Sequence, residues 1–323
     1  MAKKSKKSYT DLRIVFMGTP EFAVASLKTL VDAGCNIVGV VTAPDKAAGR
    51  GLQLQQSAVK KYAIENGLPV LQPEKLKAPV FLDQVRALQA DLQVVVAFRM
   101  LPELVWKMPP MGTINLHGSL LPQYRGAAPI NWAIINGETE TGVTTFKLQH
   151  EIDTGNILLS QKILIGNNET AGELHDGMKE IGAALVLKTI KGIAEGSIKE
   201  QPQTLLTVSD LLPKLKAAPK LFTETCSINW SKPVNEVYDL IRGLSPYPCA
   251  FTRLNTKTLK IFRAEPLPGR PDSTLPGNFE TDKKTYLRFA CTDGYISIKE
   301  LQLEGKKKMK IEEFLRGFHF DTK

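Results

Sequence analysis

The chain has 323 residues, of which 43% are hydrophobic and 23% charged, and its formal net charge at pH 7 is +9. This length and composition indicate two globular domains and exclude collagen-like, coiled-coil and intrinsically disordered proteins. No stretch approaches the roughly 18 consecutive apolar residues of a membrane-spanning helix, and the lysine-rich N-terminus lacks the cleavage pattern of a signal peptide, so we expect a cytoplasmic protein without membrane contact.

Strands and helices alternate through the first half of the chain. Short apolar runs predict strands at Leu12–Met17, Ile37–Val41, Val70–Leu71 and Leu92–Ala97. Helical spacing predicts helices at Phe22–Ala33, Ser57–Asn66 and Val80–Leu88 between them. Strands that are apolar on both faces and separated by helices are typical of a covered parallel sheet. We therefore predict a doubly wound, mostly parallel α/β sheet.

The pattern changes after a long predicted helix at Ala171–Glu195. A stretch rich in proline and lysine follows, and we interpret residues 199–219 as a linker between domains at 11–198 and 220–323. Beyond it we predict a short helix at Pro233–Gly243 and strands at Ala250–Leu254, Leu259–Ala264, Tyr286–Ala290 and Tyr295–Leu303. Short strands separated by glycine and proline turns favour a small, OB-like β-barrel, a fold that often binds nucleic acid.

The positive charge is concentrated at the two ends of the chain. Residues 207–323 carry 20 basic and 14 acidic side chains, a net charge of +6. This asymmetry favours a polyanionic partner for the C-terminal third, although a basic surface that only confers solubility is an equal alternative at this stage.

The cysteines give no sign of a metal site. Four cysteines stand singly, without a CxxC pair or a histidine at zinc spacing: Cys35, Cys226, Cys249 and Cys291. We expect reduced structural thiols and no metal.

The densest group of polar side chains lies at residues 113–129. Asn115 and His117 alternate with apolar residues on a predicted strand, so their side chains project from the same face. Gly118 then allows the chain to turn. The carboxyl end of a strand is where open α/β sheets bind ligands.

Asp153 follows a predicted strand at Val143–Leu148 and stands in a Thr-Gly turn. Beside His117, its carboxylate would favour the protonated imidazole. Asn115, His117 and Asp153 would then form an acyl-transfer set, in which one group accepts an amine proton and the others stabilise an oxyanion. From spacing alone, a purely structural histidine is equally consistent.

Several motifs together resemble the folate-dependent formyltransferases. They are MGTPEF at 17–22, AGRG at 48–51, INLHGSLLPQYRGAAPI at 114–130 and DTG at 153–155. The similarity continues into the second domain at 218–220, 228–230 and 241–246, and so covers nearly the whole chain. It is strongest to the members of that family that act on methionyl-tRNA.

The resemblance implies a substrate pair and a set of site residues. The formyl donor would be 10-formyltetrahydrofolate, and the acceptor would be the α-amine of initiator methionyl-tRNA, with a monomeric enzyme. Asn115, His117 and Asp153 would be catalytic, and the segment Ser119, Leu120, Leu121 and Pro122 would bind folate. Arg50 would reach the tRNA, whose phosphates would also meet Lys306, Lys307 and Lys308 unless these only form a solvated turn.

Two departures from the family pattern and three rival functions accompany this prediction. Phe98-Arg99 and Gln123 replace residues common in relatives near the folate site. The rivals are a formyltetrahydrofolate hydrolase, a sugar-amine formyltransferase, and a non-catalytic RNA-binding protein on the same fold.

Overall fold

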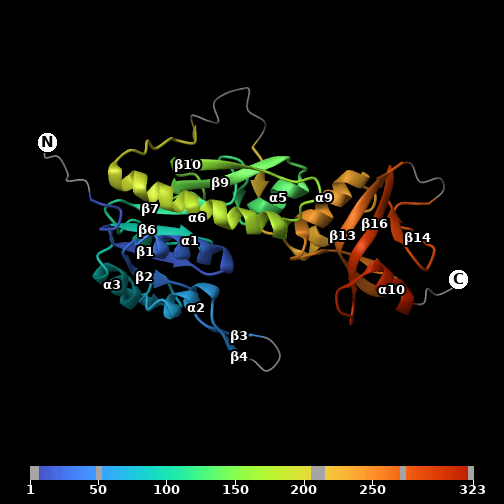
Figure 1. Cartoon of the computed structure of the whole chain (residues 1–323), viewed down its shortest axis with the longest axis horizontal. Helices are drawn as coiled ribbons and strands as arrows, with labels where there is room; N and C mark the ends of the chain where they lie inside the picture. Colours follow the sequence, from blue (N-terminus) through green and yellow to red (C-terminus); the bar gives the residue numbers. More distant parts are fainter. Residues whose placement is uncertain (1–6, 49–52, 205–214, 270–273, 319–323) are drawn as a thin grey trace. The chain divides into compact units, whose positions relative to one another are not determined.

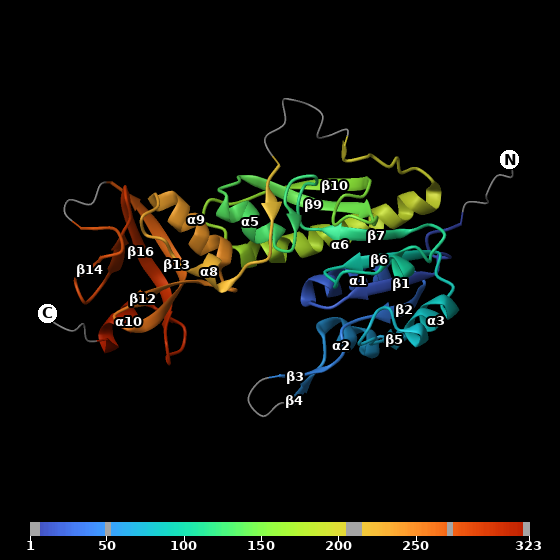
Figure 2. The ribbon, with the colours of Figure 1, turned by 180° about the vertical axis from the view of Figure 1, so that it is seen from behind.

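The computed structural model describes residues 7–48, 53–204, 215–269 and 274–318 (Figures 1 and 2). The chain folds into two compact units that interleave along the sequence. Unit 1 comprises Met1–Arg125, Gly142–Ile163 and His175–Lys216, and unit 2 comprises Gly126–Thr141, Leu164–Leu174 and Ala217–Lys323. The predicted boundaries at 11–198, 199–219 and 220–323 divide the chain by sequence alone and stay a prediction.

A seven-stranded sheet forms the centre of unit 1. Its order is β10-β9-β7-β6-β1-β2-β5. The strands are β1 (Ile14–Gly18), β2 (Ile37–Val41), β5 (Val70–Leu71), β6 (Leu92–Val96), β7 (Thr113–His117), β9 (Glu140–Lys147) and β10 (Ile157–Leu164). The five strands from β7 to β5 pair in parallel, whereas β9 is antiparallel to β7.

Helices cover both faces of this sheet. They are α1 (Glu21–Asp32), α2 (Ala58–Glu65), α3 (Pro79–Ala87), α4 (Glu103–Trp106) and α6 (Ala171–Glu195). Val15 and Val95 pack with side chains of α3 and α4 on one face. On the other face Gly182 of α6 lies directly against Leu116 of β7. The prediction of a doubly wound, mostly parallel sheet is confirmed.

A second, antiparallel sheet forms a half-barrel in unit 2. Its order is β12-β13-β16-β15-β14, and β17 pairs with β16. The elements are α5 (Pro129–Ile135), α8 (Thr223–Cys226), α9 (Val234–Leu244), β12 (Ala250–Leu254), β13 (Lys257–Pro268), β14 (Phe279–Thr281), β15 (Leu287–Ala290), β16 (Gly294–Leu303), β17 (Met309–Lys310) and α10 (Ile311–Gly317). Outside these two sheets, four short strands form two-stranded sheets: β3 (Lys46–Ala48) pairs with β4 (Gln53–Gln55), and β8 (Arg125–Gly126) pairs with β11 (Ala217–Ala218).

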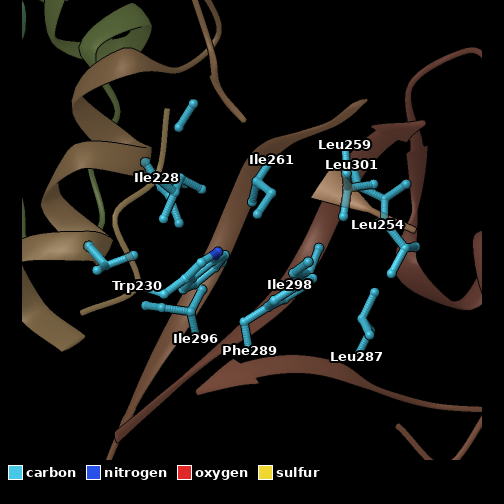
Figure 3. Close-up of a cluster of buried hydrophobic side chains, with 14 of the residues drawn as sticks. Ile228, Trp230, Leu254, Leu259, Ile261, Leu287, Phe289, Ile296, Ile298 and Leu301 are labelled. Carbon is cyan, nitrogen blue, oxygen red and sulfur yellow. The ribbon is translucent and has the colours of Figure 1, made fainter. Parts of the chain in front are cut away.

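The core of unit 2 gathers around an aromatic pair. The rings of Trp230 and Phe289 stack with their centroids 4.7 Å apart. Ile296 and Ile298 of β16 alternate with polar residues and turn inward beside them (Figure 3). Alternation of this kind gives each strand one apolar face, which the half-barrel buries.

Within the described residues, no helix is long and apolar enough to cross a membrane.

Glu280 is the centre of a polar network on the half-barrel. Its carboxylate accepts hydrogen bonds from the hydroxyls of Thr274 and Tyr295, each at 2.6 Å. The guanidinium of Arg288, directly across the strand pair, donates two more at 2.9 and 2.7 Å. These donors favour the ionised carboxylate and lower the pKa of Glu280 from its ordinary 4.5 to about 2.

We expect the contribution of Glu280 to stability to depend on pH. Because the pKa is lower in the folded chain, the stabilisation is complete above pH 4.5 and is lost as the pH falls toward 2. Since the carboxylate is partly exposed, Glu280→Gln should lower the Tm by roughly 1–4 °C at pH 7. The difference from wild type should shrink between pH 4.5 and pH 3 in calorimetry. Glu312→Gln, on the exposed side of α10, is the matched control, and a Tm difference that stays constant with pH would contradict the assignment.

Candidate active site

Strand β7 presents Asn115 and His117 at the carboxyl edge of the parallel sheet. Asn115 pairs with Val95, whose side chain packs toward α3 and α4, so both polar side chains project on that face. Asn115 is half-buried and His117 is only 6% exposed. The loop that follows β7 supplies a hydrogen-bond partner for one ring nitrogen of this buried imidazole, and the loop that follows β9 brings a carboxylate toward the other.

Both ring nitrogens of His117 face oxygen atoms. Nε2 lies 2.9 Å from the carbonyl oxygen of Tyr124. Nδ1 lies 3.8 Å from a carboxylate oxygen of Asp153, which is close enough for an ion pair but too long for a hydrogen bond. The ring also meets the edge of Phe146, with the centroids 6.5 Å apart. His117 is therefore held by the backbone of the loop after β7 and faces the carboxylate of Asp153.

Gly155 lets the loop after β9 fold tightly against that strand. A methyl group at Gly155 would lie 1.6 Å from the carbonyl oxygen of Lys147, so only glycine fits. Asp153, two residues earlier, has a φ of 54°, in the left-handed region that few non-glycine residues adopt. The DTG motif therefore combines a glycine required by close approach with an aspartate held in an uncommon backbone conformation.

The segment Ser119–Pro122 is fixed largely through its backbone. Ser119 is fully buried, and its hydroxyl donates to the carbonyl oxygen of Gln123 at 2.6 Å. Thr144 of β9 donates to the carbonyl oxygen of Ser119 at 2.7 Å and accepts from the amide of Leu121 at 3.2 Å. Sequence reasoning did not single out Thr144, because a threonine on a buried strand carries no separate signal.

The two departures from the family pattern have structural roles of their own. Arg99 donates from its guanidinium to the carbonyl oxygens of Pro73 and Glu74, and so ties the loop after β6 to the loop after β5. The side-chain oxygen of Gln123 accepts a hydrogen bond from the amide of Lys216 at 2.9 Å. Each of these two side chains therefore joins two segments of the backbone: Arg99 joins the loops after β5 and β6, and Gln123 joins the loop after β7 to Lys216.

The residues predicted to contact tRNA lie apart from this cluster in the sequence. Arg50 falls outside the described residues. Lys307 pairs with Glu313 at 3.5 Å, and Lys308 pairs with Glu300 at 2.6 Å. The side chain of Lys306 is exposed. Among the described residues, no three His, Cys, Asp or Glu side chains group as metal ligands would.

We expect Gly155→Ala to displace the loop that carries Asp153, because its added methyl group would collide with backbone rather than with a flexible side chain. Activity should fall by about 10²-fold, as expected for a misplacement of about 1 Å in a catalytic group. Gly177→Ala is the control, since Gly177 lies exposed on α6 with open space around it. That variant should keep its activity and gain up to about 1 kcal/mol of stability. Equal activities for the two variants would contradict this reading of the loop.

Comparison with known proteins shows the family to which the chain is similar. The family model described as formyl transferase matches residues 12–190, and the model of the formyl transferase C-terminal domain matches residues 220–319. A methionyl-tRNA formyltransferase of Bacteroides fragilis is 54% identical over 96% of both chains. One from Flavobacterium johnsoniae is 49% identical over 96% of this chain and 97% of its own.

Solved structures share the fold at lower identity. An N-formyltransferase from Helicobacter canadensis, in complex with folinic acid and dTDP-3-aminofucose, superposes with a TM-score of 0.65 at 20% identity, covering 92% of this chain and 100% of its own. HypX from Aquifex aeolicus, in complex with tetrahydrofolic acid, gives a TM-score of 0.63 at 18% identity, covering 95% of this chain and 48% of its own. With both family models matched in order and relatives similar along nearly their whole length, the chain belongs to the formyl transferase family.

Proposed function

We propose that the chain transfers the formyl group of 10-formyltetrahydrofolate to the α-amine of initiator methionyl-tRNA. The approach of Asp153 to His117 beside Asn115, in a chain of this family, is the observation that carries the proposal. The names of its relatives support the acceptor, since eight proteins at 49–54% identity are called methionyl-tRNA formyltransferase.

The three side chains have the chemistry that formyl transfer requires. One C–N bond to the formyl carbon breaks at the folate nitrogen and another forms to the amine, so one proton must leave the amine and one must reach the departing nitrogen. The Asp153 carboxylate can accept the proton of the attacking amine. Asn115 and protonated His117 can donate hydrogen bonds to the formyl oxygen as it gains negative charge. No oxidation or reduction is involved.

The loops at the carboxyl edge of β6 and β7 would hold the folate. These strands are parallel neighbours, so the segments at 97–102 and at Ser119–Pro122 leave the sheet at the same edge. Because the hydroxyl of Ser119 is already bonded to Gln123, we assign it a role in shaping this loop. Folate contacts from the segment would then come from backbone groups and from Leu120, which is half-buried.

The tRNA would be bound by residues outside the catalytic cluster. We assign Arg50 to the acceptor end and the excess positive charge of residues 207–323 to backbone phosphates. Of the three lysines proposed at 306–308, Lys306 and Lys307 are the better candidates. Lys307 lies 3.5 Å from Glu313, whereas Lys308 lies only 2.6 Å from Glu300 and also over the ring of Phe262. We further propose a monomer that acts in the cytoplasm.

A direct assay separates this function from its rivals. The purified chain is incubated with 10-formyltetrahydrofolate and one acceptor at a time: initiator methionyl-tRNA, a dTDP-amino sugar, or water alone. We expect formyl-methionine to form on the tRNA, with no formylated sugar and little free formate. Formate release in every arm would identify a hydrolase, formylated sugar a sugar-amine transferase, and tRNA binding without any product a non-catalytic protein.

Substitutions in the catalytic group should lower kcat far more than they change tRNA affinity. We expect His117→Ala and Asn115→Ala each to reduce kcat by about 10²–10³, the usual effect of removing one donor to a developing oxyanion. Asp153→Ala should also alter the pH dependence of kcat. His150→Ala is the control, since His150 is almost fully exposed. Turnover near wild type in either of the first two variants would remove that residue from the mechanism.

The lysines should affect binding and its salt dependence. We expect Lys306→Ala/Lys307→Ala to raise the KM for tRNA with little change in kcat. For every phosphate that is no longer neutralised, the slope of log Kd against log salt should fall by up to about 0.9. Lys61→Ala/Lys188→Ala, at two exposed positions on helices of unit 1, is the control of equal charge. If both double variants show the same slope, the lysines at 306–307 are not part of the tRNA surface.

A further inference from the structure

Residues 200–203 run alongside the loop that carries Asp153. Glu200 accepts from Asn156 at 3.0 Å and pairs with Lys147 at 2.5 Å. Gln201 and Ile157 exchange two backbone hydrogen bonds, at 2.8 and 2.9 Å. The segment is therefore attached to both sides of the loop, although its sequence predicts a polar linker.

Gln203 makes the deepest of these contacts. Its amide nitrogen donates to the carbonyl oxygens of Asp153 at 2.9 Å and of Gly155 at 2.8 Å. Its amide oxygen accepts from Nε and Nη2 of Arg125 at 3.1 and 2.6 Å. The side chain uses both of its donors and both of its acceptor positions, and the residue is 2% exposed.

The partners of Gln203 define which way its amide points. Reversing the amide would place its oxygen against two carbonyl oxygens and its NH₂ group against a guanidinium that has no acceptor. The guanidinium of Arg125 therefore favours the orientation of the Gln203 amide in which its nitrogen points toward the loop.

This clamp acts on a residue whose backbone conformation needs support from its surroundings. Asp153 has left-handed backbone angles, and such a conformation persists only where its surroundings hold it. The two carbonyl groups held by Gln203 lie at Asp153 itself and two residues later. Fixing them limits the rotation of the peptide planes from which the Asp153 carboxylate is directed to His117, 3.8 Å away.

We propose that Gln203 is a positioning residue for Asp153, and that Arg125 acts through Gln203. The inference rests on the proposed function, because it assumes that Asp153 takes part in formyl transfer. Gln203 touches no reacting atom in this scheme. Its loss should lower kcat while leaving the KM for tRNA nearly unchanged, since the clamp is directed at the catalytic loop.

The test compares three single variants in formyl transfer to methionyl-tRNA. Gln203→Ala removes the whole clamp, whereas Gln203→Glu keeps an acceptor for Arg125 and loses the two donated hydrogen bonds. Gln201→Ala is the matched control, because the exposed Gln201 contacts the loop through its backbone. We expect both Gln203 variants to lose about 10- to 100-fold in kcat, with the KM for tRNA within twofold of wild type.

A double-mutant cycle with Asp153→Asn separates positioning from a general structural role. If Gln203 acts through Asp153, adding Gln203→Ala to Asp153→Asn should reduce the residual kcat by less than twofold. A loss of Gln203→Ala that is carried in full into the double variant would overturn the proposal, and so would a kcat within twofold of wild type for both single Gln203 variants. Failure of the proposed function is distinct, because wild type and Gln201→Ala would then yield no formyl-methionine either.

Discussion

The close approach of Gly155 to the backbone of Lys147 is the constraint on which the candidate site depends. The loop after β9 leaves the sheet beside the start of β7, and this contact folds it back along its own strand toward the end of β7, where Asp153 approaches His117. Without that fold, the loop would not bring the carboxylate of Asp153 to the imidazole of His117 at the end of β7. Because backbone atoms meet directly at this point, the tolerance for any side chain is nil.

Around this contact, polar side chains form hydrogen bonds to the backbone of the loops that carry the site. The proposed catalytic side chains are not needed for that structural role. Thr144 bonds the main chain at Ser119 and Leu121, and Gln203 bonds it at Asp153 and Gly155. A buried hydroxyl or amide that donates to main-chain carbonyl groups cannot turn toward a substrate without leaving a carbonyl unpaired. Such a site is preorganised, so little reorganisation accompanies the charge that develops during reaction.

Much of the fold could be predicted from local pattern. The bounds of β2, α6 and β12 agree with the predicted ranges, because apolar runs and helical spacing are unbroken there. The common face of Asn115 and His117 follows from the two-residue period of a strand alone. The whole strand β10 was missed, since Ser160, Gln161 and Lys162 interrupt its apolar pattern.

The contacts that hold the site could not be predicted in this way. Gln203 lies 50 residues from Asp153 and 78 from Arg125, within a stretch whose composition is typical of a linker. The charge run at 306–308 likewise gave no sign that Lys308 pairs with Glu300 on the neighbouring strand. Local sequence carries information on periodicity and turns, whereas these partnerships are set by which strands become neighbours.

The interleaving of the two units has a consequence for synthesis on the ribosome. Helix α5 belongs to unit 2 and packs on α9, where Asn131 bonds the carbonyl oxygen of Gly243, 112 residues later in the chain. At translation rates of about 5–20 residues per second, α5 leaves the ribosome roughly 5–20 s before its partner exists. During that interval Ile135 of α5, which packs against Gly243 and the apolar core of unit 2, has no lasting cover. The nascent chain therefore passes through a state in which most strands of the seven-stranded sheet have emerged from the ribosome. In that state α5, which lies between β8 and β9 in the sequence, does not yet have α9 to pack against.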